Sequence, residues 1–125
     1  MNYRLGAAGY LALDELRSRD PAGSTGNYGS LDQRAVLTWV QANIKNFGGD
    51  PDNIVLWGES AGAAGVTAHL AMERSWPHFH KAVIESGAFN GWSYKTHADA
   101  VAAISSRDAP ATEAGGAAAT PMAVD

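Results

Sequence analysis

One short run in the sequence has residue types and spacing suited to nucleophilic chemistry: Gly58-Glu59-Ser60-Ala61-Gly62. It matches the Gly-x-Ser-x-Gly pattern, in which a serine stands on a sharp turn between a strand and a helix. A serine hydroxyl is a poor nucleophile unless it stands clear of the sheet and meets a base. Glycines two residues to either side let strand and helix close around the turn without Cβ collisions. The backbone N–H of Ala61 would then point toward a developing oxyanion, helped by the positive end of the following helix.

The flanking residues supply the elements that such a turn needs. Asn53–Trp57 is a continuous β-branched and aromatic run, typical of a strand buried on both faces. Gly58–Gly62 predicts the turn, Ala63–Met72 a helix and Lys81–Glu85 a second strand. Strand, helix and strand of this length predict a βαβ crossover with parallel strands, so the expected fold class is α/β. A glycine-rich turn with an incidental serine stays open, because the pentapeptide alone is a weak signal in a chain with 14 glycines.

A longer helix is expected upstream of the first strand, and a different composition follows the second. Ser30-Leu31-Asp32-Gln33 has the form of a capping box, in which Ser30 caps the helix and Gln33 reaches back. Apolar residues at helical spacing continue to Phe47, and Gly48-Gly49 ends the helix. Residues 95–125 form an Ala-rich tail, expected to be helical over Ala98–Ser105 and disordered over about its last fifteen residues.

Several blocks of the sequence stand in an order that is typical of one family. They are Asn2-Tyr3-Arg4-Leu5-Gly6, Gly9–Leu13, Gly26–Arg34, Trp39-Val40, Phe47–Pro51, Gly58–Gly62 and Glu85-Ser86-Gly87. Together they resemble the type-B carboxylesterase and cholinesterase-like group of α/β hydrolases. The resemblance runs from Asn2 to about Trp92 and implies that residues 1–94 are a partial α/β-hydrolase domain. It also implies a carboxylic ester hydrolase that forms an acyl-enzyme, acts on a small-molecule ester and needs no cofactor.

The resemblance assigns roles to the residues around the motif. Ser60 would be the acyl-accepting nucleophile, and the Ala61 N–H would be one oxyanion donor. Glu59 resembles the family's acidic neighbour of the nucleophile, which can bias the site toward cationic transition states; a carboxylate at a free motif position is the alternative. Ser86 resembles a serine that supports the catalytic acid, with a simple strand-end cap as the alternative.

Arg4 and Asp32 resemble a buried ion pair of the family. Such a pair would be structural, because removing either partner leaves a buried charge without compensation. We expect the charged groups of the two side chains to lie within about 4 Å of each other.

The family's catalytic acid and histidine would both follow the end of this chain, because in this fold the nucleophile precedes its acid and then its histidine. The glycine-rich oxyanion segment would precede Met1. We therefore expect a fragment that holds Ser60 without its base and is inactive, or nearly so, by itself. His69 would lie about 13 Å from Ser60 at 1.5 Å per helical residue. His78 and His80 would lie about 15 Å away, at the opposite edge of the strands.

The remaining histidine suggests no catalytic base, and no metal site is expected. His97 is not excluded by distance, but a surface position is its expected place. His78-x-His80 alternates in a polar loop without a third ligand. Two other classes of protein stay open beside the esterase. A non-catalytic adhesion or scaffolding relative shares the fold, although retention of Ser60 argues against it. An inert truncation product is favoured by the Ala-rich tail.

Composition narrows the classes further. With 9 Lys+Arg against 13 Asp+Glu and a net charge of −4, no basic patch is available to bind nucleic acid. The absence of cysteine excludes disulfides and thiol catalysis. No apolar run approaches the roughly 18 residues of a membrane span. Any export signal would precede Met1, so secreted and cytoplasmic locations both stay open.

Overall fold

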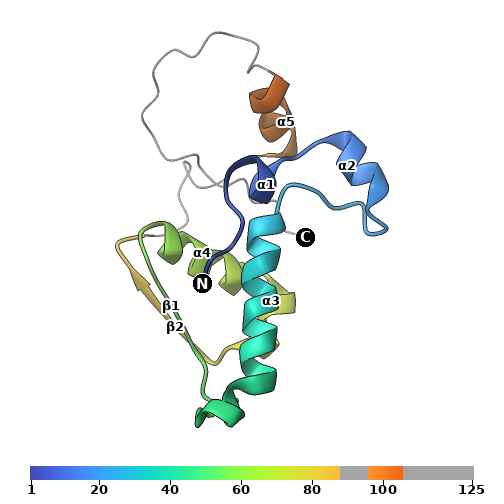
Figure 1. The fold of residues 1–125 in the computed structure, drawn as a ribbon. Helices are drawn as coiled ribbons and strands as arrows, with labels where there is room; N and C mark the ends of the chain where they lie inside the picture. The colour runs from blue at the N-terminus through green and yellow to red at the C-terminus, as the bar shows by residue number, and fades with distance from the viewer. Residues whose placement is uncertain (88–95, 106–125) are drawn as a thin grey trace. The chain divides into compact units, whose positions relative to one another are not determined.

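The computed structural model describes residues 1–87 and 96–105. The elements in chain order are α1 (Gly6–Tyr10), α2 (Asp14–Arg19), α3 (Tyr28–Asn43), the 3₁₀ helix η1 (Ile44–Phe47), β1 (Val55–Glu59), α4 (Ala61–Ala71), the 3₁₀ helix η2 (Glu73–His78), β2 (Lys81–Glu85) and α5 (His97–Ser105) (Figure 1). These residues form two compact units: residues 30–87 make one, and residues 2–29 with 96–105 make the other. Within the described ranges, no helix combines the length and the apolar character needed to cross a bilayer.

The strands of the first unit pair in parallel, side by side in Figure 1, with Val55 opposite Lys81 and Glu59 opposite Glu85. Helix α4 connects them and packs on both. The predicted parallel βαβ arrangement is confirmed, and β2 has its predicted bounds. Because the strands are parallel, their carboxyl ends meet at the same edge of the sheet. The residues that follow β1 and β2 therefore become neighbours.

The core of this unit covers one face of the sheet. It consists of buried apolar residues from α3, β1 and α4 with two partly buried neighbours: Leu37, Leu56, Val66, Phe79 and Ala82. Val55 and Trp57 alternate with Leu56 and are 49% and 66% exposed. Within the described residues, β1 is therefore buried on one face only, and the burial on both faces that its apolar run predicts is not reached. A strand turns alternate side chains to opposite faces, and this core packs on only one of them.

The start of α3 differs from the prediction. The helix begins at Tyr28, so Ser30 lies inside its first turn and is not the cap. Gly26, with a φ of 90°, turns the chain just before this start. Gln33 does not reach back to Ser30 but contacts His69 of α4. The Gln33 side chain thus bonds to a buried residue of another helix, His69, instead of forming the predicted capping box.

The end of the same helical stretch agrees with the prediction. After Asn43 the α-helix tightens into η1, which ends at Phe47. Gly48 follows with a φ of 82°, and its N–H donates to the carbonyl groups of Ile44 and Lys45. A left-handed glycine of this kind is the usual way to stop a helix.

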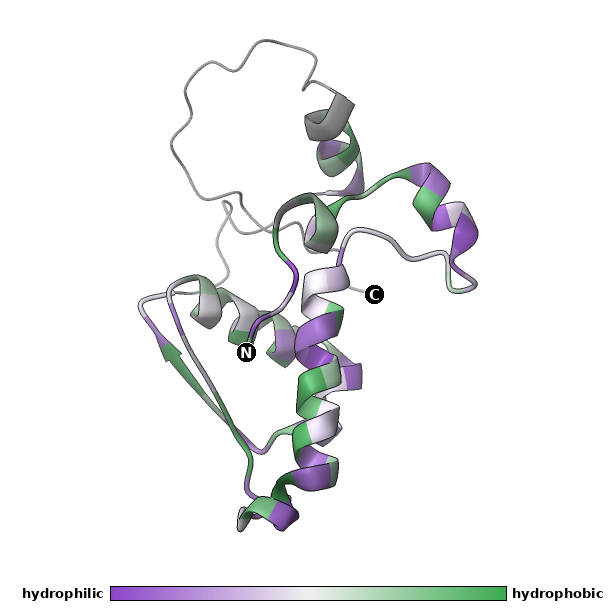
Figure 2. Ribbon diagram, viewed as in Figure 1, coloured by the Kyte–Doolittle hydropathy of each residue, from purple (hydrophilic) through white to green (hydrophobic). Residues whose placement is uncertain are grey.

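Figure 2 shows hydrophobic and hydrophilic residues interspersed along α3.

The second unit joins the N-terminal residues to α5. Within it, Tyr10 and Ala12 are buried, and the guanidinium carbon of Arg4 lies 5.6 Å from the ring centroid of Tyr28. Helix α5 begins after Thr96, whose hydroxyl both accepts from the Asp99 N–H at 3.1 Å and donates to the Asp99 carboxylate at 2.7 Å. This local cap explains why a short Ala-rich segment is helical here. The rest of the predicted tail, residue 95 and residues 106–125, lies outside the described residues.

Candidate active site

Ser60 is the single residue between β1 and α4. The turn is thus narrower than the predicted Gly58–Gly62, because the strand continues to Glu59 and the helix starts at Ala61. Ser60 has a φ of 52° and a ψ of −116° and is exposed. Residues other than glycine rarely adopt positive φ, and holding one there costs on the order of 1–3 kcal/mol. The surrounding structure must therefore hold Ser60 in place.

Hydrogen bonds hold the backbone of Ser60 on both sides. Its N–H donates to the carbonyl oxygen of Glu85 at 2.9 Å, and its carbonyl oxygen accepts from the Ala64 N–H at 3.1 Å. Ser60 is also the N-cap of α4, a position where serine commonly caps through its side chain, yet here the side chain makes no cap hydrogen bond. Ala61 opens the helix, so its N–H has no acceptor within the helix. An exposed hydroxyl and a helix-start N–H thus lie on adjacent residues.

The two motif glycines are not equivalent. A Cβ at Gly58 would collide with the carbonyl oxygen of Gly62 and would lie 2.8 Å from the nitrogen of Ala63. A Cβ at Gly62 would meet nothing within 4 Å. The prediction that both glycines avoid Cβ collisions is confirmed for Gly58 and wrong for Gly62, because strand and helix approach each other on the Gly58 side only.

Two carboxylates and a second strained serine lie at the same sheet edge. Leu56 and Ala82 face the core, so Glu59 and Glu85, three residues further along each strand, face the other way. Both are exposed, and they are partners in the register of the parallel pair. Ser86 follows β2, is exposed and has a φ of 52°. The predicted supporting residues thus lie beside the turn, at the carboxyl ends of the two strands.

His69 is the most buried histidine of the described part, with 1% of its surface exposed. Its Nε2 lies 3.0 Å from the side-chain oxygen Oε1 of Gln33, and its Nδ1 lies 2.9 Å from the Ser75 hydroxyl. Because the Gln33 oxygen can only accept, Nε2 of the neutral ring donates the proton, and Nδ1 accepts from Ser75. Both ring nitrogens are therefore engaged in a buried network that ties α4 to α3 and η2.

Burial lowers the pKa of His69 from 6.5 to about 4, and the positive charge of Arg34 adds to the lowering. The unfolded chain therefore binds a proton at His69 over a pH range in which the folded chain does not. Stability is fully present above pH 6.5 and falls as the pH drops toward 4, by roughly 3 kcal/mol for this group.

We expect urea unfolding of the full chain to show this loss between pH 7 and pH 4.5. The His69→Gln variant should lose less stability over the same interval, because it has no ring to protonate. Equal losses of stability in the wild type and the variant would contradict the assignment of this pH dependence to His69.

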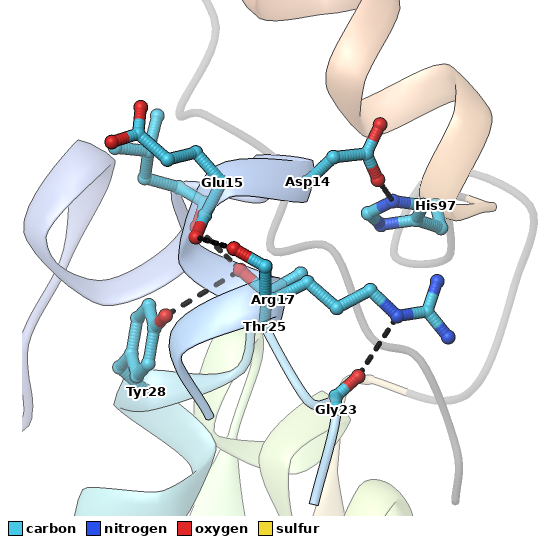
Figure 3. Close-up of polar contacts among 9 residues, drawn as sticks. Asp14, Glu15, Arg17, Gly23, Thr25, Tyr28 and His97 are labelled. Carbon is cyan, nitrogen blue, oxygen red and sulfur yellow. Dashed lines mark hydrogen bonds and ion pairs between the residues drawn. The ribbon is translucent and has the colours of Figure 1, made fainter. Parts of the chain in front are cut away.

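The other three histidine rings also have partners other than Ser60. His78 Nδ1 lies 2.7 Å from the Gln41 side-chain oxygen, and His80 Nδ1 accepts from the Ile54 N–H at 3.1 Å. In the second unit, His97 Nε2 lies 3.0 Å from the Asp14 carboxylate (Figure 3). Among residues 30–87, the described part of the first unit, no histidine is thus placed as the base of Ser60.

The predicted ion pair of Arg4 and Asp32 stays a prediction. Arg4 belongs to the second unit and Asp32 to the first. Within its own unit, the Arg4 guanidinium faces the Tyr28 ring at a distance typical of a cation–π contact.

Sequence reasoning missed the buried network of Gln33, His69 and Ser75. One signal was available, because His69 stands at helical spacing from Val66, which is buried on α4. No local signal pointed to Gln33, which is 36 residues away in the chain. Gly65 leaves it room, since a Cβ there would lie 3.2 Å from the Gln33 oxygen.

Comparison with known proteins places the chain in a family. A family model described as "Carboxylesterase family" matches residues 1–114. Cholinesterase of Mus musculus is 47% identical over 96 residues, which are 76% of this chain and 15% of the relative. Acetylcholinesterase of Electrophorus electricus is 50% identical over 91 residues, which are 73% of this chain and 14% of the relative. The chain thus spans about 15% of the length of these curated relatives. The family has the α/β-hydrolase fold, with which the parallel strand pair and its helices agree. The chain belongs to the carboxylesterase family.

Proposed function

We propose that the protein is a carboxylic ester hydrolase with Ser60 as its nucleophile, and that the turn between β1 and α4 is the nucleophile elbow of an α/β hydrolase. One observation carries the proposal. Ser60 is an exposed N-cap serine at positive φ whose hydroxyl makes no cap hydrogen bond. A turn with a purely structural role would have less strain energy with glycine at this position, because glycine adopts positive φ without strain. Strain of this kind is typical of functional sites.

In the proposed reaction, the Ser60 oxygen attacks the carbonyl carbon of a small-molecule ester and the alcohol leaves. Water then hydrolyses the acyl-enzyme and restores the hydroxyl. The Ala61 N–H donates to the oxyanion, and Glu59 favours cationic transition states. Ser86 supports the catalytic acid. A catalytic acid and a histidine base complete this mechanism by moving the Ser60 proton to the leaving alcohol, and no cofactor takes part.

A chimera tests the proposal by supplying those residues. Residues 2–92 of this chain would replace the matching segment of the Electrophorus electricus acetylcholinesterase. We expect a fluorophosphonate probe to label the chimera at Ser60, identified by peptide mass spectrometry, and p-nitrophenyl acetate to be hydrolysed. A chimera that is folded by circular dichroism but unlabelled at Ser60 would count against the proposal.

Residues 1–125 expressed alone should be inactive, or nearly so. Without a base Ser60 stays protonated, and hydrolysis of p-nitrophenyl acetate should be at least roughly 10³-fold slower than by the chimera. Initial rates measured at equal protein concentration check this. Comparable rates would show that a histidine of this chain serves as the base.

A further inference from the structure

The end of β2 contacts the backbone of Ser60 at two places. The Ser60 N–H donates to the carbonyl oxygen of Glu85. Two residues later, Gly87 comes so close that an added Cβ would lie 2.5 Å from the Ser60 carbonyl oxygen and 2.7 Å from the Cβ of Ala63. Real Cβ atoms essentially never approach another heavy atom this closely, so with a side chain at Gly87 the turn or the segment after β2 would have to shift.

We propose that Gly87 is a positioning residue for Ser60: its lack of a side chain lets the segment after β2 brace the serine backbone in the positive-φ conformation. The proposal rests on the proposed role of Ser60 as nucleophile. Gly87 lies outside the Gly-x-Ser-x-Gly motif, whereas Gly62 lies inside it and has open space around its Cβ position. The close approach to the serine backbone thus comes from the segment that follows the neighbouring strand.

The geometry explains why a small displacement would matter. Gly87 does not need glycine for its own φ, since its φ is outside the positive range. The constraint is therefore the contact with Ser60, and its closest atom is backbone, which cannot rotate away. Shifting the Ser60 carbonyl also disturbs its hydrogen bond with the Ala64 N–H. A misplacement of about 1 Å in a nucleophile can cost roughly a hundredfold in rate.

The test compares fluorophosphonate labelling rates at Ser60 in the chimera. Gly87→Ala should lower the rate roughly 10- to 100-fold. The control is Leu37→Val, which weakens the same core without touching the turn; it should lower Tm but leave the labelling rate within about twofold of wild type. A Gly87→Ala rate equal to that of the control would overturn the proposal.

A double variant separates the two contacts of Gly87. Gly87→Ala with Ala63→Gly removes the clash with α4 and keeps the clash with the Ser60 carbonyl oxygen. We expect the double variant to regain part of the lost Tm while its labelling rate stays low. If Ala63→Gly restores labelling, Gly87 acts through helix packing and not through Ser60.

Amide exchange in the full chain distinguishes this proposal from the proposed function. The Ser60 N–H should exchange roughly tenfold faster in Gly87→Ala than in Leu37→Val, because the bond to Glu85 is loosened locally. If Ser60 of the wild-type chimera is never labelled, the proposed function fails. The role of Gly87 in holding the Ser60 backbone is then tested by the exchange rate of the Ser60 N–H alone. Equal exchange rates of the Ser60 N–H in the two variants would overturn the proposal that Gly87 positions Ser60.

Discussion

Ser60→Ala should lower hydrolysis of p-nitrophenyl acetate by the chimera roughly 10⁴-fold or more, because no acyl-enzyme can form without the hydroxyl. The substitution keeps the Cβ and hence the positive-φ strain, so stability should change little. Ser18→Ala is the control, since Ser18 is an exposed serine of α2 whose hydroxyl bonds only to the Glu15 carbonyl. It should leave the rate unchanged. A Ser60→Ala chimera that retained its activity would remove the nucleophile from the proposal.

Ser60→Gly should lose the same activity but gain stability. Glycine adopts a φ of 52° without the strain that serine carries there, and this relief exceeds the added entropy of the unfolded chain. The expected net gain is about 1 kcal/mol in the free energy of unfolding of the full chain. Urea titration of both variants measures it. A destabilised Ser60→Gly would indicate that the turn is not strained.

Gly58→Ala should destabilise the full chain by about 3 kcal/mol or more, near the upper end for overpacking. The three atoms nearest to its Cβ would be backbone atoms of the first turn of α4, so relief requires moving the helix away from β1. The resulting loss should appear as a lower urea midpoint with an unchanged slope.

Gly62→Ala is the matched control, because it adds the same methyl group to the same motif in open space. Gly62 lies within α4, so alanine there should raise stability by up to about 1 kcal/mol through helix propensity. If Gly58→Ala and Gly62→Ala had equal free energies of unfolding, the conclusion that only Gly58 avoids a Cβ collision would be wrong.

Local patterns predicted much of the first unit. The bounds of β2, the parallel pair and the helical stop at Gly48 all followed from residues close together in the chain. Element boundaries were less certain: β1 and α4 each reach to within one residue of Ser60, because the strained turn needs no further loop residues.

The sequence by itself determined the motif, its serine and the elements on either side, since hydrophobic runs and turn residues act on their immediate neighbours. Only the tertiary structure decided which residues hold the serine. The brace by Gly87 and the bond between Gln33 and His69 join segments far apart in the chain. Likewise, the exposure of Trp57 depends on which sheet face the helices cover. Such contacts follow from the packing of whole elements, and no local pattern encodes them.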